Sequence, residues 1–125
     1  MPASYVIDTE ANRAVITATA RLTDDELVAC VIELRNDPDL PMGCPTLSDL
    51  TQVTHMDVTM ESFETIAKIM TETDERRGAA KVAIVVDKEG DLLLGKLFVA
   101  VGRIPKGQTS IEIFRSKAEA EAWIS

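Results

Sequence analysis

Residues 14–26 are AVITATARLTDDE, and this stretch contains the transition that decides the fold. From Ala14 to Leu22, side chains alternate between a more apolar and a more polar side, which is typical of a β-strand with one buried face. Thr23 and Glu26 then form an S/T-x-x-E capping box, which satisfies free amide groups at the start of a helix. A strand that passes directly into a helix at Asp24 indicates an α/β architecture.

The neighbouring residues predict a hairpin before this strand and an amphipathic helix after it. Residues Tyr5 to Asp8 are rich in β-formers, and the polar stretch from Glu10 to Arg13 separates them from the next strand as a turn would. The helix is expected to end before Pro38. Its inner stripe consists of Leu27, Val31 and Leu34.

The central part of the chain predicts a short strand, a polar loop and a regular helix. The strand is expected from Pro45 to Leu50, and the loop from Thr51 to Asp57. Thr59 is in the position of an N-cap, and Gly78 is expected to close the helix. The apolar residues between them recur at helical spacing, namely Phe63, Ile66, Ala67 and Met70.

The last part of the chain continues the alternation of strands and helices. Val82 to Val86 is an unbroken apolar run, which is typical of a central strand with neighbours on both edges. We expect a helix from about Asp91 to Val101, a strand from Ser110 to Phe114, and a short helix after Ser116. The sequence therefore predicts a single α/β domain over residues 1–125, with about five strands, the first antiparallel and the others mostly parallel, and about four helices.

The charge balance and the cysteine content limit the classes of partner. Lys and Arg number 13 against 21 Asp and Glu, a net charge of −8, so nucleic acid is not an expected partner. The longest apolar stretch, Leu92 to Val101, contains Gly95 and Lys96, so no transmembrane segment is expected. Two cysteines without a secretory signal predict a cytoplasmic location. No motif indicates a cofactor.

The segment from Leu47 to Thr59, LSDLTQVTHMDVT, resembles the SpoIIAA-like proteins of the STAS superfamily, together with the element order and the chain length. The resemblance covers nearly the whole chain and implies a SpoIIAA-like β-α superhelix. In anti-sigma-factor antagonists of that family, the second Ser of an Asp-Ser-Ser motif is the regulatory phosphorylation site. Thr59 matches that Ser and Asp57 the acidic position, whereas Val58 replaces the first Ser and Met60 replaces the usual Gly. The β-α superhelix is also shared with lipid-binding SEC14-type domains.

Several polar residues near the end of the third predicted strand are candidate site residues. Thr59 is a candidate phosphorylation or switch site, and its simpler interpretation is a helix N-cap. The candidate binding loop contains Asp49, Thr54, His55 and Asp57. His55 beside Asp49 or Asp57 would allow proton transfer, although no nucleophile accompanies them. The spacing of His55, Cys30 and Cys44 matches no metal-ligand pattern, so no metal site is predicted.

Three hypotheses for function follow from these features. The first is a non-enzymatic regulatory or protein-interaction module of STAS type, which presents the segment from Thr51 to Thr59 and the following helix to a protein partner. The second is a domain that binds a small apolar or lipid-like ligand between sheet and helices, as the SEC14 likeness implies. The third, ranked last, is an enzyme that uses His55. A homodimer is also expected if the strand from Ser110 to Phe114 is an exposed edge.

Overall fold

The structure, a computed structural model, describes residues 3–77, 80–87, 95 and 110–125, and its strands form one mixed sheet. The five described strands have the order β1-β2-β3-β4-β5. β1 (Ala3–Asp8) pairs antiparallel with β2 (Arg13–Thr23), and β3 (Thr46–Asp57), β4 (Lys81–Val85) and β5 (Ser110–Phe114) follow in parallel. The predicted α/β class, with an antiparallel first strand, is confirmed.

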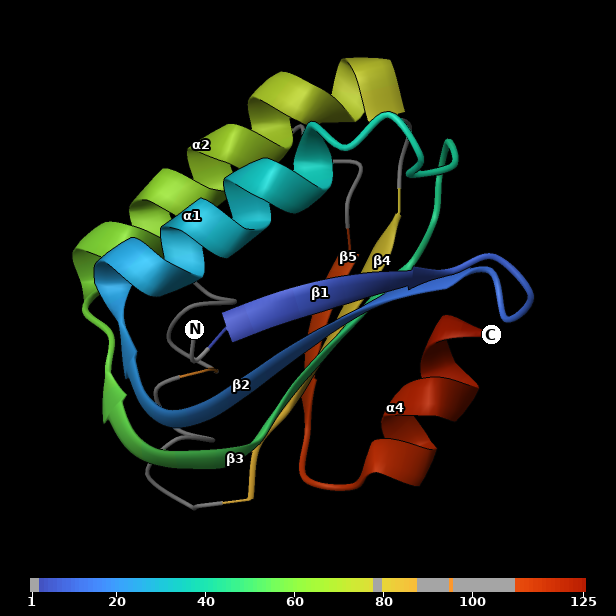
Figure 1. Cartoon of the computed structure of the whole chain (residues 1–125). Coiled ribbons are helices and arrows are strands. Elements are labelled where there is room, and N and C mark those ends of the chain that lie inside the picture. Colours follow the sequence, from blue (N-terminus) through green and yellow to red (C-terminus); the bar gives the residue numbers. More distant parts are fainter. Residues whose placement is uncertain (1–2, 78–79, 88–94, 96–109) are drawn as a thin grey trace.

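Helices cover both faces of the sheet. α1 (Asp24–Arg35) and α2 (Met60–Arg77) lie side by side on one face, and α4 (Lys117–Ile124) lies on the other (Figure 1). The described residues thus contain three helices, not the four that were expected. The helix predicted from Asp91 to Val101 lies outside the described residues except at Gly95. That residue is helical, and a β-carbon added to it would lie 3.0 Å from Ile113 Cδ1 of β5.

The helix starts predicted from capping patterns are correct for α1 and α4. At α1, Thr23 Oγ1 accepts a hydrogen bond from the Glu26 amide at 3.4 Å, and Glu26 Oε1 accepts one from the Thr23 amide at 3.3 Å. At α4, Ser116 Oγ accepts from the Glu119 amide at 3.3 Å. Because these contacts span only three residues, the sequence pattern alone was sufficient to locate them.

The polar loop predicted from Thr51 to Asp57 is wrong, because these residues form the second half of β3. β2 has 11 residues and provides ladder partners along nearly all of β3, from Ala14 opposite Thr46 to Thr23 opposite Asp57. The ladder shifts register between Ala20 and Arg21, where Ala20 has a φ of 57°. Such an irregularity bends a strand, and the far ends of β2 and β3 curve toward the starts of α1 and α2 (Figure 1).

Alternate residues of the central strands face two separate apolar layers. Leu47, Ala83 and Val85 pack against Ala120 and Ile124 of α4. The opposite face of the sheet packs against α1 and α2. Its inward side chains from β3 and β4 include Thr46, Ser48, Leu50, Val82 and Ile84. This second layer contains the candidate site because its packing leaves a pocket.

Candidate functional site

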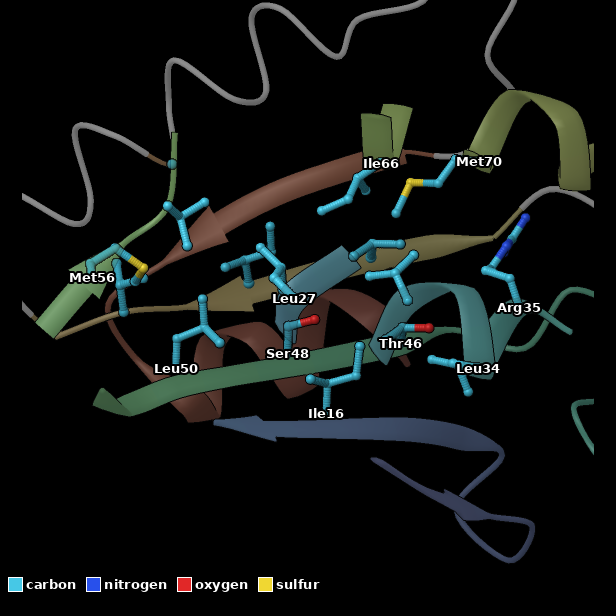
Figure 2. Close-up of a pocket in the computed structure, with 16 residues that line it drawn as sticks. Ile16, Leu27, Leu34, Arg35, Thr46, Ser48, Leu50, Met56, Ile66 and Met70 are labelled. Carbon is cyan, nitrogen blue, oxygen red and sulfur yellow. The ribbon is translucent and has the colours of Figure 1, made fainter. Parts of the chain in front are cut away.

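A pocket of about 70 Å³ lies between the sheet and the helices α1 and α2 (Figure 2). One water molecule needs roughly 10–15 Å³ on the same measure, so the pocket has room for a group much larger than a single water. Its described wall is mainly aliphatic. α1 contributes Leu27, Val31 and Leu34, and α2 contributes Ile66 and Met70. The strands contribute Ile16, Leu50, Val82 and Ile84, and Val86 lines the pocket directly after β4. Five residues of the predicted inner stripes therefore line the pocket, three from α1 and two from α2.

Three polar side chains interrupt this apolar wall. Arg35, Thr46 and Ser48 are 5%, 7% and 9% exposed, respectively. Arg35 Nε donates a hydrogen bond to Thr73 Oγ1 at 2.8 Å, and this contact anchors the guanidinium between the two helices. The Thr46 and Ser48 hydroxyls make no hydrogen bond with another described residue. They are not among the fully buried unpartnered side-chain atoms, which in the described residues comprise only Arg13 Nε, so these two hydroxyls face the open space of the pocket.

The polar residues of the pocket lie among apolar ones. Figure 2 shows Arg35 and Thr46 at one end together with Leu34 and Met70. Ser48 lies near the middle, and Leu50 and Met56 lie toward the other end. Thr46, Ser48 and Leu50 alternate along β3, so their side chains point to the same face of the sheet. β3 therefore contributes two hydroxyls and one leucine to the wall of the pocket.

Thr59, the predicted switch residue, lies at the junction of the starts of α1 and α2. Its amide donates to Asp24 Oδ1 at 2.7 Å and its hydroxyl donates to Asp24 Oδ2 at 2.6 Å. Partial burial raises the pKa of Asp24, but hydrogen bonds from Thr59 and Ser62 outweigh this effect and hold the pKa below its usual 3.8. The ionised carboxylate of α1 therefore serves as a cap for α2.

The other predicted site residues do not form one group. Asp57 forms an ion pair with Arg21 of β2, and Thr54 and His55 are exposed on the last part of β3. Asp49 points to the opposite face of the sheet, where Oδ1 accepts from Thr51 Oγ1 at 2.6 Å. Its Oδ2 lies 3.8 Å from Lys117 Nζ, beside α4.

The enzymatic hypothesis gains no support from this arrangement. In the part of the chain that the structure describes, no hydrogen bond or ion pair joins His55 to Asp49 or Asp57. The two carboxylates instead bind Arg21 and Thr51. His55 therefore lacks the orienting carboxylate that proton transfer at this position would use.

Both cysteines are buried free thiols. Burial and then the charge of Glu33 raise the pKa of Cys30 to about 11, and burial raises the pKa of Cys44. Among the described residues, no three His, Cys, Asp or Glu side chains gather as a possible metal site. The two thiols therefore act as small apolar core groups.

Sequence reasoning missed the polar residues of the pocket. A partial signal was present, because Arg35 follows Val31 by four residues and so continues the inner stripe of α1. Thr46 and Ser48 precede Leu50 at a spacing of two within the predicted strand, on the same face. What the pattern did not indicate is that these positions, on separate elements, line one pocket.

With a mixed five-stranded sheet, two helices on one face and one on the other, the chain has a SpoIIAA-like fold. A similar solved structure is that of an uncharacterized protein of the DUF3478 family with a SpoIIAA-like fold from Shewanella loihica. It is 14% identical, has a TM-score of 0.59, and aligns over 98% of this chain and 92% of that chain. No family model and no curated protein matches the sequence. The resemblance predicted from the sequence is thus confirmed for the fold.

No helix among the described residues is long and apolar enough to cross a membrane.

Proposed function

We propose that this protein is a non-enzymatic domain that binds a small apolar ligand in the pocket between the sheet and the helices α1 and α2. The observation that carries the proposal is a pocket of about 70 Å³ with an aliphatic wall in a chain of only 125 residues. Interiors of proteins are normally packed to crystal-like density, so a void of this size costs stability. A bound apolar ligand would recover the lost contacts.

Native mass spectrometry of freshly purified protein tests this proposal. We expect a mass above that of the bare chain under gentle conditions, and the added mass should disappear when the protein is denatured. Organic extraction of the same sample should release an amphiphilic or apolar compound. A bare mass under gentle conditions, combined with failure to take up any apolar probe, would contradict the proposal.

A pocket-filling variant makes the test specific for this site. Ile84 lines the pocket and is only partly buried, so Ile84→Phe places a larger side chain in the space that the ligand would occupy. We expect this variant to keep the fold and to lose the added mass. Val6→Phe is the matched control, because it enlarges an apolar side chain on β1 that is 66% exposed. Equal retention of ligand by both variants would place the ligand elsewhere.

A second candidate function, a STAS-type regulatory module, is supported by the position of Thr59. Its hydroxyl is exposed and is bound to Asp24 at the junction of α1 and α2. A phosphoryl group on Thr59 would carry about two negative charges and would be repelled by the Asp24 carboxylate. Phosphorylation would therefore separate the starts of the two helices that form one wall of the pocket, and would alter the surface offered to a protein partner.

Incubation of the protein with lysate of its host and ATP, followed by mass spectrometry, tests the regulatory function. Modification of Thr59 in the wild type, with loss of the signal in Thr59→Val, would support it. Thr65→Val is the matched control, because Thr65 is an exposed threonine within α2. An unmodified Thr59 without a co-purifying partner would remove the support for this function.

A further inference from the structure

β1 forms one end of the sheet, and no described strand pairs with its outer edge. Natural proteins often protect such an edge with a lysine, a proline or a bulge. β1 has the sequence ASYVID, which contains neither lysine nor proline, and its ladder with β2 has no register shift from Ala3 to Asp8. Val6, in the middle of the strand, is 66% exposed. β1 therefore offers a regular edge to a further strand.

The hydrogen bonds of β2 indicate which backbone groups of β1 point outward. The Ala14 amide donates to the carbonyl of the residue before β3 at 2.9 Å, so Ala14 directs its backbone groups toward β3. This direction alternates along a strand, so Val15 directs its groups toward Val6, its ladder partner in β1. The N–H and C=O groups of Tyr5 and Ile7 therefore point to the outer edge.

We propose that the strand that pairs with this edge is β1 of a second copy of the chain, antiparallel about a two-fold axis, with the two Val6 residues opposite each other. In this register, Tyr5 lies opposite Ile7 of the second copy, and the two exchange backbone hydrogen bonds. On the other face, the Ser4 hydroxyl lies opposite Asp8 of the second copy and donates to its carboxylate. One strand thus supplies both halves of a symmetric interface.

The pairing also covers the most exposed apolar side chain of β1. Tyr5 packs against the core on the α1 side, so its neighbour Val6 faces the opposite side of the sheet. Val6 lies beside Val15 of β2, which is partly buried. In the dimer, these two residues and the same two of the second copy form one continuous row of valines across the joined sheets.

The other edge strand, β5, is less suited to the same kind of pairing. Its central residue, Glu112, is exposed. Antiparallel pairing about the centre of β5 would place two Glu112 carboxylates opposite each other, and like charges in this position are destabilising. The inference is independent of the proposed ligand, because no residue of β1 is among the described residues that line the pocket.

Sedimentation velocity over a dilution series, in a buffer of high ionic strength, tests the dimer. High salt screens the repulsion between two chains of net charge −8. A single pair of strands is a small interface, so we expect a dissociation constant in the micromolar range. Val6→Lys removes the valine contact and sets two like charges opposite each other, so it should raise the dissociation constant at least about tenfold.

Met42→Lys is the matched control for Val6→Lys. It makes the same charge change at an apolar side chain that is 73% exposed, between α1 and β3, and should change the dissociation constant by no more than about twofold. Both substitutions make an acidic chain less acidic. If overall charge alone governed association, both variants would therefore dimerise more tightly than the wild type.

Disulfide cross-linking tests the register. The two Val6 residues form a non-hydrogen-bonded pair, whose Cα atoms lie about 4.5 Å apart, within the range that a disulfide spans. Val6→Cys should therefore form a covalent dimer when oxidised glutathione is added. Ser4→Cys is the matched control on the same face of β1 and should stay unlinked, because it lies opposite Asp8. The native Cys30 and Cys44 are buried and should not react.

Three outcomes would overturn the proposal. A wild type that stays monomeric at several hundred micromolar would leave this edge to a strand of another protein. A dissociation constant of Val6→Lys equal to that of the wild type would place the interface elsewhere, on β5 for example. Cross-linking of Ser4→Cys as readily as Val6→Cys would contradict the register.

Discussion

The single tyrosine of the chain, Tyr5, provides a direct test of the contacts between β1 and the end of α1. Its hydroxyl donates to Asp37 Oδ2 at 2.7 Å. This hydrogen bond, then burial and the charges of Asp37 and Glu33, raise the pKa of Tyr5 from 10.0 to about 12. The protonated tyrosine is therefore favoured in the folded state, and its contribution to stability is complete below pH 10 and is lost as the pH rises to about 12.

Absorbance at 295 nm measures this ionisation without interference from a second tyrosine. We expect a midpoint near 12 while circular dichroism shows that the protein is folded. Asp37→Asn removes the charged acceptor and should move the midpoint back toward 10, and Tyr5→Phe provides the baseline. A midpoint near 10 in the folded wild type would contradict the hydrogen bond.

Residue-scale features were predictable where the contact is local. Thr23 and Ser116 were assigned as caps because their partners lie three residues further on. Arg35, Thr46 and Ser48 were not recognised as a set, because they come from a helix end and a strand that meet only in the folded chain. Asp49 was grouped with His55, although it faces the α4 side of the sheet with Lys117.

At the scale of elements, Asp24 holds the starts of α1 and α2 together. Its two oxygens accept the Thr59 amide and hydroxyl, so Asp24→Asn weakens both hydrogen bonds. We expect a loss of about 1 kcal/mol in the free energy of unfolding at pH 7, in the range of a lost helix cap. Asp25→Asn is the matched control, because Asp25 is an exposed acid in the same first turn of α1.

This loss depends on pH, because the pKa of Asp24 is lower in the folded protein than its usual 3.8. The stabilisation is present above pH 3.8 and disappears as the pH falls through the folded pKa. In urea unfolding series, the difference between wild type and Asp24→Asn should therefore shrink below about pH 4. If Asp24→Asn and Asp25→Asn lowered the free energy of unfolding equally at every pH, the hydrogen bonds to Thr59 would not contribute. The effect would then come from the interaction of either acid with the helix dipole.

The strand β3 is longer than the sequence analysis predicted. Its second half, from Thr51 to Asp57, contains mostly polar residues and was interpreted as a loop. An alternation is nevertheless present, because Val53 is buried between the exposed Gln52 and Thr54. The polar residues are held in the sheet by the long partner β2, and that pairing is a tertiary property absent from the local pattern.

At the scale of the whole molecule, the order of strands and helices was enough to predict the architecture. Parallel strands must be joined by crossover connections, so the predicted alternation of strands and helices implied a mainly parallel sheet covered by helices. The structure has this arrangement from β2 to β5. The pocket was not predictable, because periodicity indicates which side chains face inward and not whether opposing layers fill the space between them. Homodimer formation through the edge strand β5 stays a prediction that light scattering would test.

A crystal structure of the protein pressurised with xenon, a small apolar probe of internal cavities, tests the central claim most directly. We predict density for xenon between the sheet and the helices α1 and α2, beside Ile84 and Met70. An empty pocket, or xenon bound only elsewhere in the protein, would contradict the account.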